Sequence, residues 1–212
     1  DYINFISSTH IDILKEVGNI GAGHSATSLS KLLEKKIDMN VPDVKIVSFN
    51  DLMEWVGGPD VVIASVFLRI EGDIPGSLFF VLSIEQAERF IKQLIGDDQF
   101  TLKETPYNEL GLSAFQELGN ILTGSYLSSL SDLTDLTIYP SVPALTIDMF
   151  GAVMSHGLIE LSHAGDFAII IDTAIKEEDQ LEEDSVKGHF FLLPDPDSFK
   201  KLFDALGVND EE

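Results

Sequence analysis

Hydrophobic positions at helical spacing mark the start of the chain and return about a hundred residues later. Ile13, Val17 and Ile20 lie three and four residues apart, which is the spacing of one face of a helix. This pattern predicts a long helix over residues 9–36. A similar pattern predicts a second long helix over residues 108–133.

Each long helix is followed by segments of β type and by a closing helix. Residues 61–70 and 77–82 are rich in β-forming residues and flank a Gly-Asp-Ile-Pro-Gly turn, so we expect a hairpin. Residues 84–95 predict a helix that ends at Gly96. The corresponding segments of the second half are residues 167–175, 188–193 and 199–206.

A stretch of eight residues is repeated and indicates internal duplication. Glu-Val-Gly-Asn-Ile-Gly-Ala-Gly begins at Glu16, and Glu-Leu-Gly-Asn-Ile-Leu-Thr-Gly begins at Glu117, 101 residues later. A repeat of this length is typical of a duplicated domain and not of a short solenoid unit. We therefore predict a single domain made of two repeats, residues 8–97 and 108–207.

The second half should be longer than the first, because the offset between matching residues grows from 101 at Pro143 to 112 at Gly188. We expect one insertion between Pro143 and Phe167 and another at residues 176–184. The second insertion is strongly acidic. A calcium loop is an alternative there, but the spacing of an EF-hand is absent, so a solvated excursion is favoured.

Composition narrows the possible classes of function. The 212 residues include 13 Lys and Arg and 36 Asp and Glu, for a formal net charge of −23. Such a chain would be repelled by nucleic acid and by anionic lipid, so neither is an expected partner. There is no cysteine, which excludes disulfides and thiolate catalysis. No apolar run has membrane-spanning length, so no membrane insertion is expected and a cytoplasmic location is the default interpretation.

The repeated polar residues share one narrow stripe on each predicted helix. With Asp12 at zero and about 100° per residue, Glu16 falls at about 40° and Asn19 at about −20°. Gly23 lies one turn beyond the asparagine. The equivalent residues of the second helix are Ser113, Glu117, Asn120 and Gly124. Because the stripe is separate from Ile13, Leu14 and Val17, a carboxylate and a carboxamide should face outward side by side.

Retention of the Glu–Asn pair in both halves favours a functional role. Other polar positions differ between the repeats: Lys15 corresponds to Gln116, and His24 to Ser125. An exposed asparagine is a mediocre helix former, so its retention beside a glutamate needs a reason other than folding. An ordinary solvated helix face is the alternative that a single copy would favour.

The spacing resembles the motif of the CheC family of chemotaxis phosphatases. That motif runs Asp or Ser, three residues, Glu, two residues, Asn, twenty-two residues, Pro, and it occurs twice here. The matching residues are Asp12, Glu16, Asn19 and Pro42 in the first half and Ser113, Glu117, Asn120 and Pro143 in the second. We therefore predict an internally duplicated, pseudo-twofold α/β (α+β) fold, with two long helices packed on a largely antiparallel sheet.

The resemblance implies hydrolysis of the aspartyl phosphate of CheY, a response regulator. In that mechanism, Asn19 or Asn120 holds the attacking water. Glu16 or Glu117 pairs with a lysine of the regulator. The Mg²⁺ beside the phosphate belongs to the regulator, so this chain is expected to bind no metal or cofactor itself. The histidines likewise show no metal-binding spacing.

A second partner is implied for the segment that follows Pro143. Apolar residues there lie at helical spacing, including Met149, Phe150 and Val153. A buried core helix is one interpretation of this edge. The resemblance favours another, a docking surface for the receptor deamidase CheD, with Asp148 at its margin.

Two other functions remain open at this point. A non-catalytic adaptor similar to the flagellar switch protein FliM would share the fold, but FliM-like domains lack the Glu–Asn pairs. An autonomous metallohydrolase that uses the acidic insertion would be active without a response regulator. Dependence of the activity on the regulator would exclude the metallohydrolase.

Overall fold

The structure is a computed structural model that describes residues 8–160 and 167–208, with the backbone alone for residues 156–160. The first half contains α1 (Ser8–Leu33), β1 (Ile37–Asn40), β2 (Val44–Ser48), α2 (Phe49–Val56), β3 (Val62–Gly72), β4 (Gly76–Ser83) and α3 (Ile84–Ile95). The second half contains α4 (Glu109–Thr134), β5 (Ile138–Pro140), β6 (Ala144–Met149), α5 (Phe150–Glu160), β7 (Phe167–Glu177), the short 3₁₀ helix η2 (Glu182–Asp184), β8 (Val186–Pro194) and α6 (Pro196–Ala205). Apart from η2, the two halves have the same order of elements.

One sheet of eight strands joins the two halves. Its order is β1-β7-β8-β4-β3-β5, with β2 also pairing with β7 and β6 with β3. All of these pairings are antiparallel. The β3–β4 and β7–β8 hairpins meet at the centre, where Phe79 lies opposite Phe191 and Phe80 opposite Phe190. The outer strands cross over, because β1 and β2 pair with β7 of the second half while β5 and β6 pair with β3 of the first.

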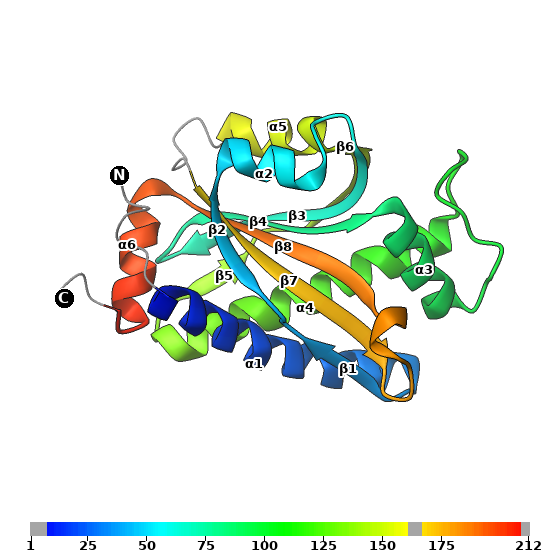
Figure 1. Ribbon diagram of the computed structural model, residues 1–212, viewed down its shortest axis with the longest axis horizontal. Coiled ribbons are helices and arrows are strands. Elements are labelled where there is room, and N and C mark those ends of the chain that lie inside the picture. The colour runs from blue at the N-terminus through cyan, green and yellow to red at the C-terminus, as the bar shows by residue number, and fades with distance from the viewer. Residues whose placement is uncertain (1–7, 161–166, 209–212) are drawn as a thin grey trace.

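Helices cover both faces of the sheet (Figure 1). The long helices α1 and α4 lie side by side on one face, and α2 and α5 lie on the other. Alternate residues of the strands supply two separate cores, as expected for a sheet buried on both faces. Phe80 and Phe190 belong to the core under the long helices. Phe79 and Phe191 belong to the core under α2 and α5.

Close contacts explain two glycines of α1 that weaken it as a helix former. A Cβ at Gly21 would lie 3.2 Å from the Cα of Tyr126, so this glycine lets α1 and α4 approach closely. A Cβ at Gly18 would lie 3.0 Å from Cγ2 of Val41. At the start of α4, Asn108 caps the helix by accepting hydrogen bonds from the backbone N–H groups of Leu110 and Gly111.

The predicted fold class is confirmed, and so are the hairpins and the helix over residues 84–95. Strands β1 and β5 were not predicted, because a strand of three or four residues is too short to show an alternation of apolar and polar residues. The expected insertion between Pro143 and Phe167 is short: β6 and α5 are the counterparts of β2 and α2, and α5 has 11 residues where α2 has 8. Across the part of the chain that the structure describes, no helix has the length and apolar character needed to cross a membrane.

Candidate active site: two Glu–Asn pairs on paired helices

The structure places each motif stripe on the outer side of its helix. Asp12, Glu16, Asn19 and Gly23 are exposed on α1, whereas Leu14 and Val17 are buried. On α4, Ser113 and Glu117 are exposed, and Asn120 and Gly124 are half-buried. Because side chains three and four residues apart are neighbours on a helix, each glutamate stands beside its asparagine.

The two stripes lie at opposite ends of the helix pair. Helices α1 and α4 run in opposite directions (Figure 1) and approach closely where Gly21 meets Ser125 and Tyr126. Glu16 precedes this crossing on α1, and Glu117 precedes it on α4. The chain therefore presents two separate sites and not one composite site.

In the first site, the side chain of Asn19 is held by the main chain of Val41. Its Oδ1 accepts a hydrogen bond from the Val41 N–H at 2.9 Å, and its Nδ2 donates to the Val41 carbonyl at 3.2 Å. The same nitrogen also donates to the Lys15 carbonyl at 3.0 Å. Both amide hydrogens are thus engaged, and a lone pair of Oδ1 is what remains for a water molecule.

This contact gives a structural reason for the proline of the motif. Val41 is buried, with 3% of its surface exposed, and its side chain packs against Gly18. Pro42 follows directly, and its ring restricts the backbone of the preceding residue to extended conformations. The proline therefore helps to hold Val41 extended where its main chain meets Asn19. Val41 was missed in the sequence, although the fixed distance from Asn19 to Pro42 pointed to this segment.

The second site lacks the corresponding contact. Val142, which precedes Pro143, is 89% exposed. Gly119 packs against Val66 of β3 and not against the residue before the proline. The Oδ1 atom of Asn120 is buried without a hydrogen-bond partner within the described residues. An unpaired buried acceptor is costly, and no main-chain group holds this amide in the way that Val41 holds Asn19.

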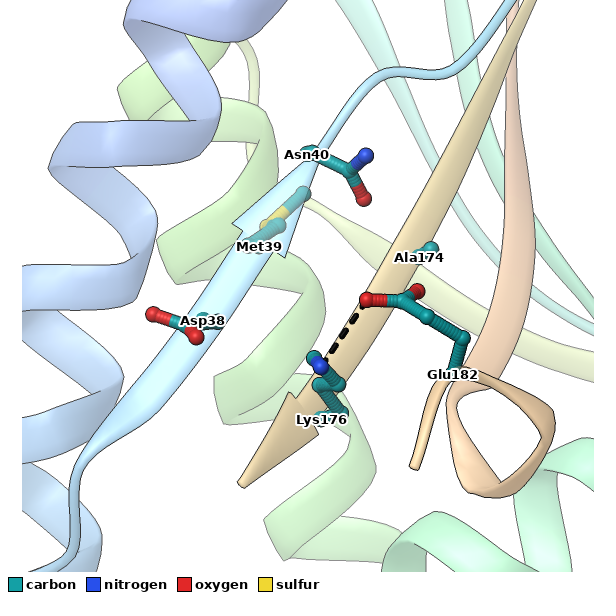
Figure 2. Close-up of a pocket in the computed structure, with 6 residues that line it drawn as sticks. All are labelled: Asp38, Met39, Asn40, Ala174, Lys176 and Glu182. Atoms are coloured by element: carbon teal, nitrogen blue, oxygen red, sulfur yellow. Dashed lines mark ion pairs between the residues drawn. The ribbon is translucent and has the colours of Figure 1, made fainter. Parts of the chain in front are cut away.

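The acidic insertion of the second half folds back onto the sheet (Figure 2). Glu182 forms an ion pair with Lys176 at 2.9 Å, and its hydrogen bond raises the pKa of that lysine. A pocket of about 300 Å³ lies there, lined by Asp38, Met39, Asn40, Ala174, Lys176 and Glu182. None of these residues belongs to a motif stripe. No cluster of three or more potential metal ligands occurs among residues 8–160 and 167–208.

The segment expected to bind CheD is mostly core. Phe150 and Val153, both on α5, are 0% and 3% exposed and pack against the sheet, as in the core-helix interpretation, and neither side chain is accessible for direct contact with a partner. Asp148 is exposed at the end of β6, and Met149 is 44% exposed. A core helix and a docking helix have the same apolar spacing, and only the neighbouring sheet distinguishes them.

Two long helices over an interlocked antiparallel sheet, each exposing a Glu–Asn pair, define a duplicated α/β protein with two equivalent motifs. Residues 10–46 and 110–147 match the CheC-like family, and these segments include both stripes and both prolines. The chain is 53% identical over 206 residues to the CheY-P phosphatase CheC of Bacillus subtilis (strain 168), which covers 97% of this chain and 98% of that protein. The chain belongs to the CheC-like family.

More distant relatives share parts of the sequence or the fold. The flagellar motor switch phosphatase FliY of Bacillus subtilis (strain 168) is 30% identical over 145 residues, 68% of this chain and 37% of that protein. The crystal structure of Thermotoga maritima FliY has a TM-score of 0.67 at 22% identity and covers 95% of this chain and 98% of its own. FliM in its complex with SpeE from H. pylori has a TM-score of 0.65 at 12% identity and covers 97% of this chain and 98% of its own. At these identities, the two structures show the fold alone.

Proposed function

We propose that this protein hydrolyses the aspartyl phosphate of CheY. The observation that carries the proposal is the presence of an outward Glu–Asn pair on each long helix, in a chain that matches a CheY-P phosphatase over nearly its whole length. The fold alone would suit an adaptor equally well, because FliM has it too. The two intact pairs favour catalysis.

The chemistry of the pair fits acyl phosphate hydrolysis. Phosphoryl transfer passes through a loose, nearly in-line transition state, so catalysis consists mainly of positioning and of charge stabilisation. The amide of Asn19 or Asn120 would orient the attacking water. A neutral amide suits this place, since a carboxylate would be repelled by the phosphoryl oxygens. Glu16 or Glu117 would pair with a lysine of CheY, and the magnesium ion beside the phosphate would come with CheY.

The two sites differ in whether the side-chain amide of the asparagine is already hydrogen-bonded within the chain. Asn19 must share its amide with the Val41 main chain, whereas the Asn120 amide makes no hydrogen bond through its buried oxygen. We infer that the second site contributes more of the hydrolysis.

The direct test is the decay of phosphorylated CheY with and without this protein. Faster decay supports the phosphatase. Binding of CheY without faster decay would support the adaptor instead. Release of phosphate from a small acyl phosphate in the absence of any regulator would support the metallohydrolase. A phosphate assay measures both kinds of hydrolysis, and a titration with labelled CheY measures binding.

Reversing the charge of the glutamates should weaken docking. Glu16→Lys and Glu117→Lys would bring two positive charges together at the regulator's lysine, so the Kd for CheY should rise by about tenfold or more at the altered site. The effect should weaken as salt is added, because exposed charges are screened. Titration of labelled CheY at several salt concentrations measures the Kd.

Asp98→Lys is the matched control for these variants. It makes the same charge change at an exposed residue of the loop between α3 and α4, outside both stripes, so binding of CheY should remain as in the wild type. Equal weakening by Asp98→Lys would mean that net charge, and not the stripe, governs docking.

We further propose that the protein is located in the cytoplasm.

We also propose that it binds a second partner, CheD, at the exposed end of β6. Asp148 and Met149 offer a carboxylate and an apolar side chain there, on an edge distant in sequence from both stripes. Asp148→Lys should abolish CheD binding in a pull-down while leaving CheY dephosphorylation unchanged. Retention of full CheD affinity by a folded Asp148→Lys variant would remove this surface from consideration.

A further inference from the structure

An isoleucine follows each of the two asparagines and lies at the margin of each stripe, between the stripe and the apolar face of the helix. Ile20 lies four residues after Glu16 and three before Gly23, so each is about one helical turn from the next. Ile121 has the same spacing on α4. The side chain of Ile20 is 37% exposed, and that of Ile121 is half-buried, with part of its surface packed against the core under the long helices. Isolated apolar residues are common on protein surfaces, so exposure alone assigns no role.

The glycine that ends each stripe supplies a second observation. A Cβ at Gly23 or Gly124 would have no atom within 4 Å. The other glycines of these helices are explained by contacts within the chain: Gly18 with Val41, Gly21 with Tyr126, Gly111 with Phe100 and Gly119 with Val66. Glycine destabilises a helix interior relative to alanine, so two glycines in open space indicate that something outside the chain comes close to the helix there.

We propose that Ile20 and Ile121 are apolar anchors that hold CheY at the two sites, with Gly23 and Gly124 leaving room for its main chain. This inference rests on the proposed function, because the anchors are continuous with the Glu–Asn stripes. An apolar contact beside an ion pair excludes water from it and adds affinity that the charges alone lack. The face of CheY that meets the stripe must therefore carry an apolar side chain close to its lysine.

The second site has a larger exposed apolar surface than the first. Leu110 is 65% exposed and lies three residues before Ser113, in line with Glu117 and Ile121. The position equivalent to Leu110 in α1 is Thr9, which has no comparable apolar surface. The second site thus has apolar side chains on both sides of its glutamate, and it should bind CheY more tightly than the first.

Single-site backgrounds allow each anchor to be tested separately. Glu117→Lys leaves the first site intact for measuring Ile20→Asp and Ile20→Thr. Glu16→Lys leaves the second site intact for measuring Ile121→Thr, which keeps the β-branched shape at a half-buried position. Each variant should raise the Kd for CheY carrying the phosphate analogue beryllium fluoride by about tenfold. With phosphorylated CheY, KM should rise while kcat is retained, because the anchors bind and do not react.

Two leucines offer matched controls. Leu32 and Leu133 are 52% and 47% exposed and are also 101 residues apart, but they lie about 120° around their helices from the isoleucines. Leu32→Asp and Leu133→Asp should leave the Kd within twofold of its background. Thermal melts establish that all variants fold.

The possible results separate the anchor from the proposed function. The anchor proposal is overturned, and the proposed function is not, if the wild type hydrolyses phosphorylated CheY and the folded Ile20 and Ile121 variants bind CheY as tightly as their backgrounds. An equal loss in the Leu32 and Leu133 controls also overturns it, since any added charge would then suffice. Absence of both binding and hydrolysis in the wild type overturns the proposed function, and the anchor with it.

Discussion

Replacing Asn19 and Asn120 together by alanine should reduce the dephosphorylation of CheY by about a hundredfold or more, to near the rate of CheY alone. The expected loss is large because both groups that would orient the attacking water are removed. Among the single variants, Asn120→Ala should remove more than half of the activity and Asn19→Ala less than half. The decay of phosphorylated CheY under single-turnover conditions measures all three rates.

The two asparagine variants should also differ in stability, in a way that checks the structure independently of activity. Asn19→Ala removes hydrogen bonds to Val41 and leaves its main-chain groups without that partner, so it should cost about 1–2 kcal/mol of unfolding free energy. Asn120→Ala removes a buried oxygen that has no partner and replaces it with a better helix former, so its stability should be unchanged or slightly higher.

Urea unfolding of both variants provides the comparison. Equal stability of Asn19→Ala and the wild type would mean that the contact with Val41 does not form. Near-normal activity of the folded double variant would show that the asparagines do not orient the attacking water.

Phe150→Ala should have the largest effect on stability, about 3–5 kcal/mol. Its ring is fully buried at the start of α5, where it contacts Phe191 with ring centroids 5.8 Å apart. Truncation leaves a cavity between α5 and the sheet. The midpoint of urea unfolding should therefore fall strongly, and any loss of CheD binding by this variant would follow from unfolding.

Met149→Ala is the control for this prediction, because Met149 precedes Phe150 directly and its side chain is 44% exposed. Its free energy of unfolding should change by less than about 0.5 kcal/mol, as is usual for surface substitutions. Similar stability losses for the two variants would contradict the burial of Phe150.

Much of the architecture could be predicted because it depends on local patterns. The long helices and the hairpin around Gly72 follow from spacings of three, four and two residues, and such spacings act between neighbours in the chain. The outward placement of Glu16 and Glu117 follows from the same helical geometry. The internal duplication could also be predicted, because the same residues recur at the same spacing in both halves of the sequence.

The remaining features depend on which surfaces meet, and no local spacing encodes that. The sequence by itself determined two long helices, each with a carboxylate and a carboxamide on its outer stripe. Tertiary structure decided that Val41 is buried against Gly18 while Val142 is exposed, and so that Asn19 is engaged and Asn120 is not. It also decided that Phe150 is core, because an apolar stripe is satisfied equally by a sheet or by a partner. The physical reason is that the burial of a residue depends on segments far away in the sequence that pack against it. Two motifs with the same residues therefore differ in their contacts when different segments pack beside them.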